Sequence, residues 1–168
     1  MDIAGLTVRQ LLALHAQIAD ELVAHRITRS YNNPTGDLAE TLFCRAFGWE
    51  QAGKSFAHVD AIDPKTKTRY QTKGRRITPV NKSRQLGALR DLLDRHFDFL
   101  AGVLFGPDYT VMRAAIIPCA VAIKVAKFVK RTNSHRFLLE DDIWEMPGVR
   151  DVTAELHAVD LDQMASCR

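Results

Sequence analysis

Cysteine is scarce in this chain of 168 residues, and it contains no long apolar run. The three cysteines, Cys44, Cys119 and Cys167, are far apart and fit no zinc-ligand spacing, so we interpret them as reduced thiols. No apolar run approaches the roughly 20 residues that a membrane-spanning helix needs. The first residues carry Asp2 and lack the basic and then apolar pattern of a signal peptide. These absences predict a cytoplasmic protein with no membrane partner.

Acidic residues are missing from one stretch, although the net charge is only +3. Between Lys65 and Arg84 there are basic residues and no Asp or Glu. Such a segment suits a polyanionic partner, with phosphate as the leading candidate. A solvated strand edge protected by lysines would give the same pattern, and composition does not separate the two. The length favours a single domain covering residues 1–168, and 46% hydrophobic with 26% charged residues is typical of a globular protein.

Apolar periodicity predicts helices alternating with strands. The predicted helices are Thr7–His25, Asp37–Phe47, Lys82–Arg95, Pro118–Arg131 and Thr153–Met164. The predicted strands are Trp49–Gly53, His58–Ile62, Arg69–Gly74, Phe97–Phe105 and Tyr109–Ile117, with Ser134–Leu139 extended. Lys54–Ala57 is expected to be a loop, and Gly48 is expected to end the second helix. The last two long strands are expected to pair in antiparallel fashion.

The stretch from His58 to Arg76 contains the residues with the most suggestive chemistry. A hairpin turning at Asp63–Pro64–Lys65 would bring Asp60 beside Gln71 and Lys73. These last two share one face of their strand because side chains alternate along it. A carboxylate and an amide oxygen can bind a divalent cation, and an ammonium group beside them can help to position a water molecule against a phosphate.

Two further groups of charged residues have alternative explanations. Glu40 lies early in the second predicted helix, where the helix dipole alone favours an acid. Lys124, Lys127 and Arg131 would form one basic face of the fourth predicted helix. That face is either solvated or a second phosphate contact.

The order of these residues resembles the core of the PD-(D/E)xK restriction-endonuclease-like superfamily. Glu40 falls on a helix, Asp60 on a strand and Gln71-Thr72-Lys73 on the next strand. The resemblance covers about residues 36–105 and is nearest to the Mrr-like variant, which has Gln in place of an acid. The strings PTGDLAE, VDAID and RYQTKGRR are also similar to an uncharacterised bacterial family of that superfamily. The resemblance implies an α/β fold with a mixed central sheet flanked by helices, an N-terminal helix at 7–25 and a C-terminal extension at 106–168.

What the resemblance implies chemically is a metal-dependent DNA endonuclease that hydrolyses phosphodiester bonds in restriction, defence or repair. Asp60 would be the main ligand of Mg²⁺ or Mn²⁺, with neutral oxygens from the Gln71 side chain and the Thr72 carbonyl. Glu40 would add a second carboxylate, directly or through water, and Lys73 would orient the attacking water. The residues expected to contact phosphate are Arg75, Arg76, Lys82 and Arg84.

Other functions remain open at this point. Gln71 in place of an acid is compatible with a nucleic-acid-binding subunit that has the fold but not the activity. A structural or interaction domain with a solvated basic hairpin is a third candidate. DNA is the expected substrate, and RNA is not excluded. A chain of this length has little room for a recognition domain, so we expect a homodimer or a partner subunit that supplies specificity.

Overall fold

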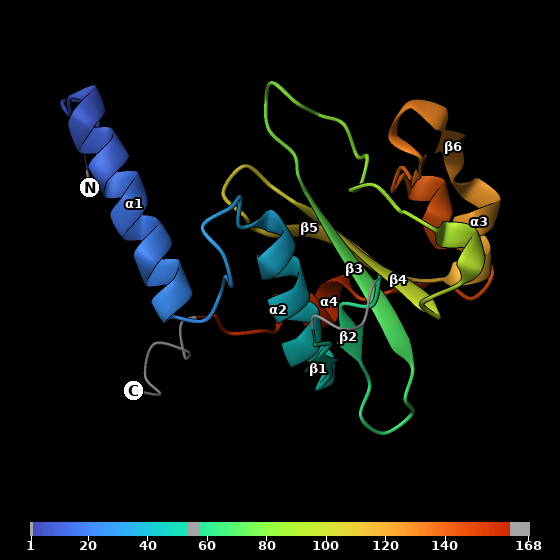
Figure 1. Ribbon diagram of the computed structural model, residues 1–168. Helices are drawn as coiled ribbons and strands as arrows, with labels where there is room; N and C mark the ends of the chain where they lie inside the picture. The colour runs from blue at the N-terminus through green and yellow to red at the C-terminus, as the bar shows by residue number, and fades with distance from the viewer. Residues whose placement is uncertain (1, 54–57, 162–168) are drawn as a thin grey trace.

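The computed structural model describes residues 2–53 and 58–161. The predicted loop Lys54–Ala57 and the end of the helix predicted at Thr153–Met164 lie outside these residues. The fold is α/β, with a mixed central sheet flanked by helices (Figure 1). The expected fold class is therefore confirmed at that level.

The central sheet has six strands in the order β1-β2-β3-β4-β5-β8. Its strands are β1 (Glu50–Gln51), β2 (Ala61–Ile62), β3 (Arg69–Arg76), β4 (Phe99–Phe105), β5 (Val111–Pro118) and β8 (Arg150–Asp151). Only β3 and β4 are parallel among these neighbours, while β4 and β5 form the expected antiparallel pair. The β2–β3 hairpin forms as predicted, with Ala61 opposite Tyr70. Its first strand is shorter than expected.

Both faces of the sheet are covered, because the central strands carry apolar side chains on each side. Helices α2 (Thr35–Phe47) and α4 (Thr153–His157) cover one face, where Phe43, Tyr70 and Ile116 share a core. The other face packs against α3 (Cys119–Val125) and the chain from 86 to 97, with Leu86, Leu100 and Ile117 in its core. The sheet is thus the rigid support on which β3 holds its polar residues.

Helix α2 packs very closely on β3, and Gly74 makes this possible. A Cβ at Gly74 would lie 2.8 Å from the Thr35 carbonyl oxygen and 3.1 Å from the Ala39 Cβ. The missing side chain therefore sets the distance between β3 and the helix that carries Glu40. A glycine inside a strand often marks such a close approach of another backbone.

We expect Gly74→Ala to destabilise the protein by about 1–3 kcal/mol, because the backbone of α2 must shift to admit the methyl group. Urea denaturation measures the effect. Gly36→Ala, inside α2, is the matched control, since a Cβ there meets nothing within 4 Å. That control should be neutral or slightly stabilising. Equal effects of the two substitutions would contradict the packing role of Gly74.

The helix predicted at Lys82–Arg95 is wrong. This segment is extended and irregular, apart from the short 3-10 helix η1 (Leu92–Asp94). The Leu86 N–H donates to the Phe137 carbonyl at 3.0 Å, and the Leu89 N–H donates to the His135 carbonyl at 3.0 Å. The leucines that suggested a helix are buried, but Leu93 is 64% exposed. Bonding to a distant segment has replaced the helical bonds.

The helix predicted at Pro118–Arg131 is also mostly wrong, since α3 ends at Val125. The chain continues into a small two-stranded sheet of β6 (Lys127–Val129) and β7 (Ser134–Arg136), joined through the 3-10 helix η2 (Lys130–Thr132). Val129 and Phe128 favour a strand over a helix. The expected basic helical face of Lys124, Lys127 and Arg131 therefore does not form. A further 3-10 helix, η3 (Asp141–Glu145), precedes β8.

The first helix, α1 (Val8–Ala24), forms as predicted but packs little against the rest of the described chain. Thr7 caps it in a capping box with Gln10. The helix stands apart from the sheet in Figure 1, and none of its residues is buried. Val8 is 74% exposed and Leu12 is 66% exposed. Its apolar stripe is therefore largely uncovered within the described chain.

Candidate functional site

The β2–β3 hairpin brings Asp60 and Lys73 together, as the sequence predicts. Asp60 directly precedes β2, and its N–H donates to the Tyr70 carbonyl at 2.9 Å. Its Oδ2 accepts the Thr72 N–H at 2.8 Å and lies 3.8 Å from the Lys73 Nζ. About a quarter of each side chain is exposed, at 25% for Asp60 and 23% for Lys73. The carboxylate is therefore anchored through one oxygen, beside an ammonium group that solvent can reach.

Gln71 and Thr72 of the same strand carry two neutral oxygens, and the Gln71 side chain shares its strand face with Lys73. The Gln71 side chain is 4% exposed, and its Oε1 is buried with no hydrogen-bond partner among the described residues. A buried amide oxygen without a partner is costly, and such atoms call for a ligand, water or ion. Tyr70 and Thr72 both direct backbone groups toward Asp60. The Thr72 carbonyl lies on the same edge, because the N–H and C=O of one strand residue point the same way.

Glu40 joins the site from α2, and it is the most electrostatically perturbed carboxylate there. Burial, and after it the negative charge of Asp60, raise the pKa of Glu40 to about 7, although the positive charge of Arg29 acts to lower it. The Glu40 side chain is only 13% exposed and forms an ion pair with Arg29. Although Arg29 and Lys73 both lower the pKa of Glu40, it stays raised, and a divalent cation beside Glu40 and Asp60 would stabilise the ionised carboxylate.

The residues present fit a hard divalent cation. Asp60, Glu40, the Gln71 side chain and the Thr72 carbonyl supply oxygen atoms only, as Mg²⁺ and Mn²⁺ prefer. The unpartnered Gln71 Oε1 is the observation that most directly suits such an ion. No group of three or more His, Cys, Asp or Glu side chains suited to a metal is found in residues 2–53 and 58–161. The candidate ligands are only two carboxylates, with two neutral amide and carbonyl oxygens, so they do not form a group of that kind.

Arg29 is the site residue that sequence reasoning missed. It lies in the loop before α2, and its N–H donates to the Asp37 Oδ2 at 2.8 Å. Asp37 thus anchors the Arg29 backbone, and the guanidinium reaches Glu40. The sequence carries no periodic signal for this contact, because it depends on how the loop folds back over the helix.

Replacing Arg29 with alanine is expected to strengthen Mn²⁺ binding by about three- to tenfold, because the guanidinium and the metal ion compete for Glu40. Calorimetric titration of Mn²⁺ measures this change. Arg45→Ala, on the exposed side of the same helix, is the control and should leave the affinity unchanged. Weaker binding after removal of Arg29 would show that the arginine does not compete with the ion.

The four predicted phosphate-contacting residues have different surroundings. The Arg75 Nε donates to the Ser83 carbonyl at 3.1 Å, and Lys82 is exposed. Arg76 donates to the Pro107 carbonyl at 2.8 Å and stacks on Tyr109, 4.6 Å from the ring centre. These contacts hold Arg75 and Arg76 in place without neutralising them. Their role toward phosphate stays a prediction.

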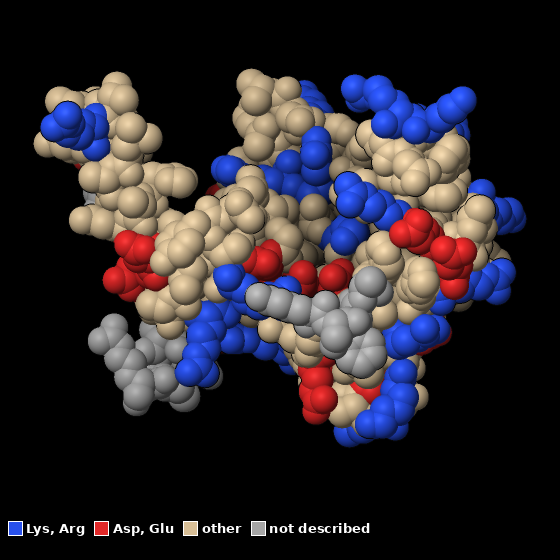
Figure 2. All heavy atoms as spheres, in the orientation of Figure 1, with Lys and Arg blue, Asp and Glu red and all other residues tan. Residues whose placement is uncertain are grey.

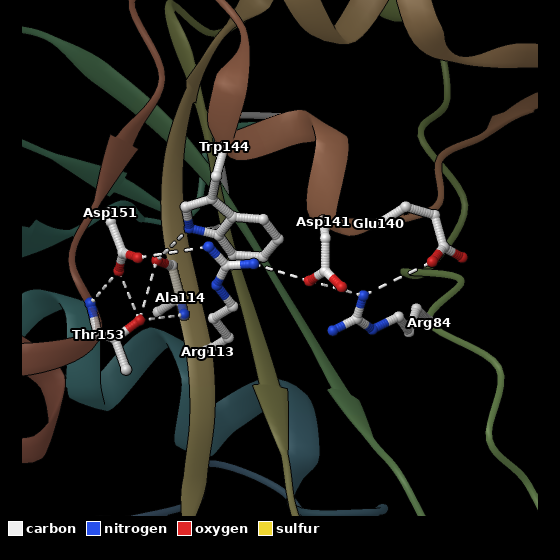
Figure 3. Close-up of polar contacts among 8 residues, drawn as sticks. All are labelled: Arg84, Arg113, Ala114, Glu140, Asp141, Trp144, Asp151 and Thr153. Carbon is white, nitrogen blue, oxygen red and sulfur yellow. Dashed lines mark hydrogen bonds and ion pairs between the residues drawn. The ribbon is translucent and has the colours of Figure 1, made fainter.

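Arg84 belongs to an ion-pair network with the C-terminal part of the chain (Figure 3). Its Nη1 lies 3.0 Å from an Asp141 oxygen and 3.6 Å from a Glu140 oxygen. Arg113 contacts the same Asp141 at 2.7 Å and lies over the Trp144 ring. Hydrogen bonds from the two arginines lower the pKa of Asp141. Since carboxylates already neutralise it, Arg84 is a poorer candidate for phosphate than Arg75 or Lys82.

Charge of both signs borders a hollow on the face shown in Figure 2. Asp and Glu atoms lie along its lower edge and Lys and Arg atoms above it, between α2 and the chain that follows β3. Two cavities lie elsewhere, beside α1. One of about 850 Å³ includes Leu14 and Leu38, and one of about 520 Å³ includes Tyr31, Asn33 and Arg76.

No known protein family matches this chain, and no curated protein matches it in sequence. In the part of the chain that the structure describes, no helix is both long and apolar enough to cross a bilayer.

Proposed function

We propose that this protein is a cytoplasmic, metal-dependent DNA endonuclease of the restriction-endonuclease-like type, close to the Mrr-like variant. The observation that carries the proposal is the convergence of Asp60 just before β2, Lys73 of β3 and Glu40 of α2. The buried, unpartnered side-chain oxygen of Gln71 on the same strand as Lys73 supports it. Restriction, defence or repair is the expected context.

The residues divide the work of phosphodiester hydrolysis in a simple way. Asp60, Glu40, Gln71 and the Thr72 carbonyl would hold Mg²⁺ or Mn²⁺. When bound, this ion offsets charge on the phosphate and lowers the pKa of a water molecule. Lys73 orients the attacking water through its ammonium group and stabilises negative charge as it develops on the phosphate. Thr72 keeps Asp60 in place through its N–H.

Basic residues near the site favour a substrate with a phosphate backbone. Arg75 and Lys82 are the stronger candidates for phosphate contact, and Arg76 is held in place by its contacts with Pro107 and Tyr109. A duplex substrate has two strands to cut, so we expect a homodimer or a partner subunit. The uncovered apolar stripe of α1 is a surface that such a second chain would suit.

A nucleic-acid-binding subunit without catalysis is the second candidate. Two observations favour it: Gln71 lacks the negative charge of an acid, and Arg29 already neutralises Glu40. Both would weaken metal binding.

Incubation of supercoiled plasmid with the protein and Mg²⁺ or Mn²⁺ separates these functions. The endonuclease predicts nicked product that EDTA abolishes and that Asp60→Ala and Lys73→Ala both lose. A gel shift without nicking would support the binding subunit. If the protein neither nicks the plasmid nor shifts it in a gel, the result would support a structural domain whose basic hairpin is a solvated strand edge.

A further inference from the structure

The segment from Cys119 to Arg136, comprising α3, β6, η2 and β7, forms a basic lobe. No Asp or Glu occurs between Tyr109 and Leu139. Five basic residues of the lobe are exposed: Lys124, Lys127, Lys130, Arg131 and Arg136. None of the five forms an ion pair with a residue of the described chain. The lobe thus carries a concentration of positive charge that the described residues leave without a counter-charge.

Two of these charges lie directly opposite one another. Lys127 of β6 pairs in register with Arg136 of β7, so both side chains project from the same face of the hairpin. Like charges in directly opposed positions destabilise an antiparallel pair. A hairpin this short gains little to offset the repulsion. An anionic partner on this face would remove it.

The chemistry of this face favours nucleic acid over an anionic membrane. Membrane surfaces are bound by basic residues together with exposed apolar side chains on the same face. The exposed aromatic of the hairpin, Phe128, lies on the opposite face, where it contacts His135 and shares a small cavity with Asp91 and Asp94. Besides its two charges, the Lys127 and Arg136 face carries only the half-buried Val129 and the buried Ser134, so its exposed part is cationic and suits a phosphate backbone.

We propose that the basic lobe is a second nucleic-acid contact, at which Lys127 and Arg136 bind backbone phosphates of duplex DNA. Figure 2 shows Lys and Arg atoms gathered around the β6 end of the molecule and again above the hollow, all on one face. One duplex lying across this face contacts both regions. This inference rests on the proposed function for the identity of its partner, and it assigns that partner a position relative to the cleavage site.

The test compares two double variants that each remove two positive charges. Lys127→Gln/Arg136→Gln changes the lobe, and Arg9→Gln/Arg45→Gln changes two exposed residues outside both basic regions. Fluorescence anisotropy with a short DNA duplex, in EDTA to prevent cleavage, gives affinity between about 50 and 200 mM salt. Thermal unfolding first establishes that both variants are folded.

The lobe variant is expected to reduce the slope of log affinity against log salt by about 1–2 and to bind about tenfold or more weakly at the upper salt concentration. The control variant should keep the wild-type slope. Equal slopes in all three proteins would overturn the assignment. So would unchanged DNA binding accompanied by lost binding to phosphatidylserine vesicles. The anisotropy assay needs no cleavage, so the two proposals can fail separately. A reduced slope in the lobe variant, with no nicking by the wild type in the plasmid assay, would support the DNA contact and reject the nuclease. Nicking by the wild type, with equal slopes in all three proteins, would support the nuclease and reject the DNA contact at the lobe.

Discussion

Replacing Lys73 with alanine is expected to slow plasmid nicking by about two to four orders of magnitude while leaving the Mn²⁺ affinity within a few-fold of wild type. The Lys73 ammonium lies 3.8 Å from the Asp60 Oδ2 and is not itself a ligand, so its loss removes water orientation and charge stabilisation without removing a metal-binding oxygen. Single-turnover nicking rates at saturating Mn²⁺ measure the first quantity, and calorimetry measures the second.

The control for this substitution is Lys65→Ala, in the exposed turn of the same hairpin. It removes the same charge from the same substructure and should leave both quantities unchanged. Two outcomes would reject the catalytic role of Lys73: a wild-type nicking rate in Lys73→Ala, or a loss of metal affinity as large as the loss of rate.

Replacing Glu40 with glutamine is expected to abolish nicking and at the same time stabilise the fold. In the folded protein without metal, burial and the charge of Asp60 raise the pKa of Glu40 to about 7, from an ordinary value of 4.5. The folded state therefore binds a proton more tightly than the unfolded state, and stability falls as pH rises between these two values. Above about pH 7 the full cost is present, at most about 3 kcal/mol.

Urea denaturation in EDTA at several pH values measures this effect. We expect Glu40→Gln to be more stable than wild type by about 1–3 kcal/mol at pH 8, with the difference vanishing below about pH 4.5. Glu50→Gln, an exposed carboxylate of β1, is the control and should show no such trend. A loss of stability at pH 8, or a gain that does not depend on pH, would contradict the idea that the charge of Glu40 destabilises the folded state.

Local patterns were sufficient to predict the elements that hold the site. The end of α2 at Gly48 and the β2–β3 hairpin are each encoded within a few residues, and both form. Gly48 has a φ of 67°, the left-handed conformation that ends many helices. Asp60 and Lys73 could therefore be paired from the sequence alone, because the hairpin turn fixes their positions.

The elements that were predicted wrongly depend on hydrogen-bond partners that are distant in the sequence. Leu86 and Leu89 have helical spacing, but their N–H groups bond to residues 135 and 137, which no local pattern indicates. The same is true of the Arg29 contact with Glu40, since it requires the loop before α2 to fold back over the helix. Of the basic face predicted on one helix, Lys127 instead lies on β6, where it is paired with Arg136 of β7.

The role of Asp60 as the anchor of a metal ion can be tested by one calorimetric titration of Mn²⁺ into the wild-type protein and into Asp60→Asn. Asp63→Asn is the control, because that residue lies in the same hairpin and accepts hydrogen bonds within its own turn. The predicted result is a site in the wild type and in Asp63→Asn that is lost in Asp60→Asn. Indistinguishable titrations for wild type and Asp60→Asn would contradict the metal site, and with it the proposed mechanism of cleavage.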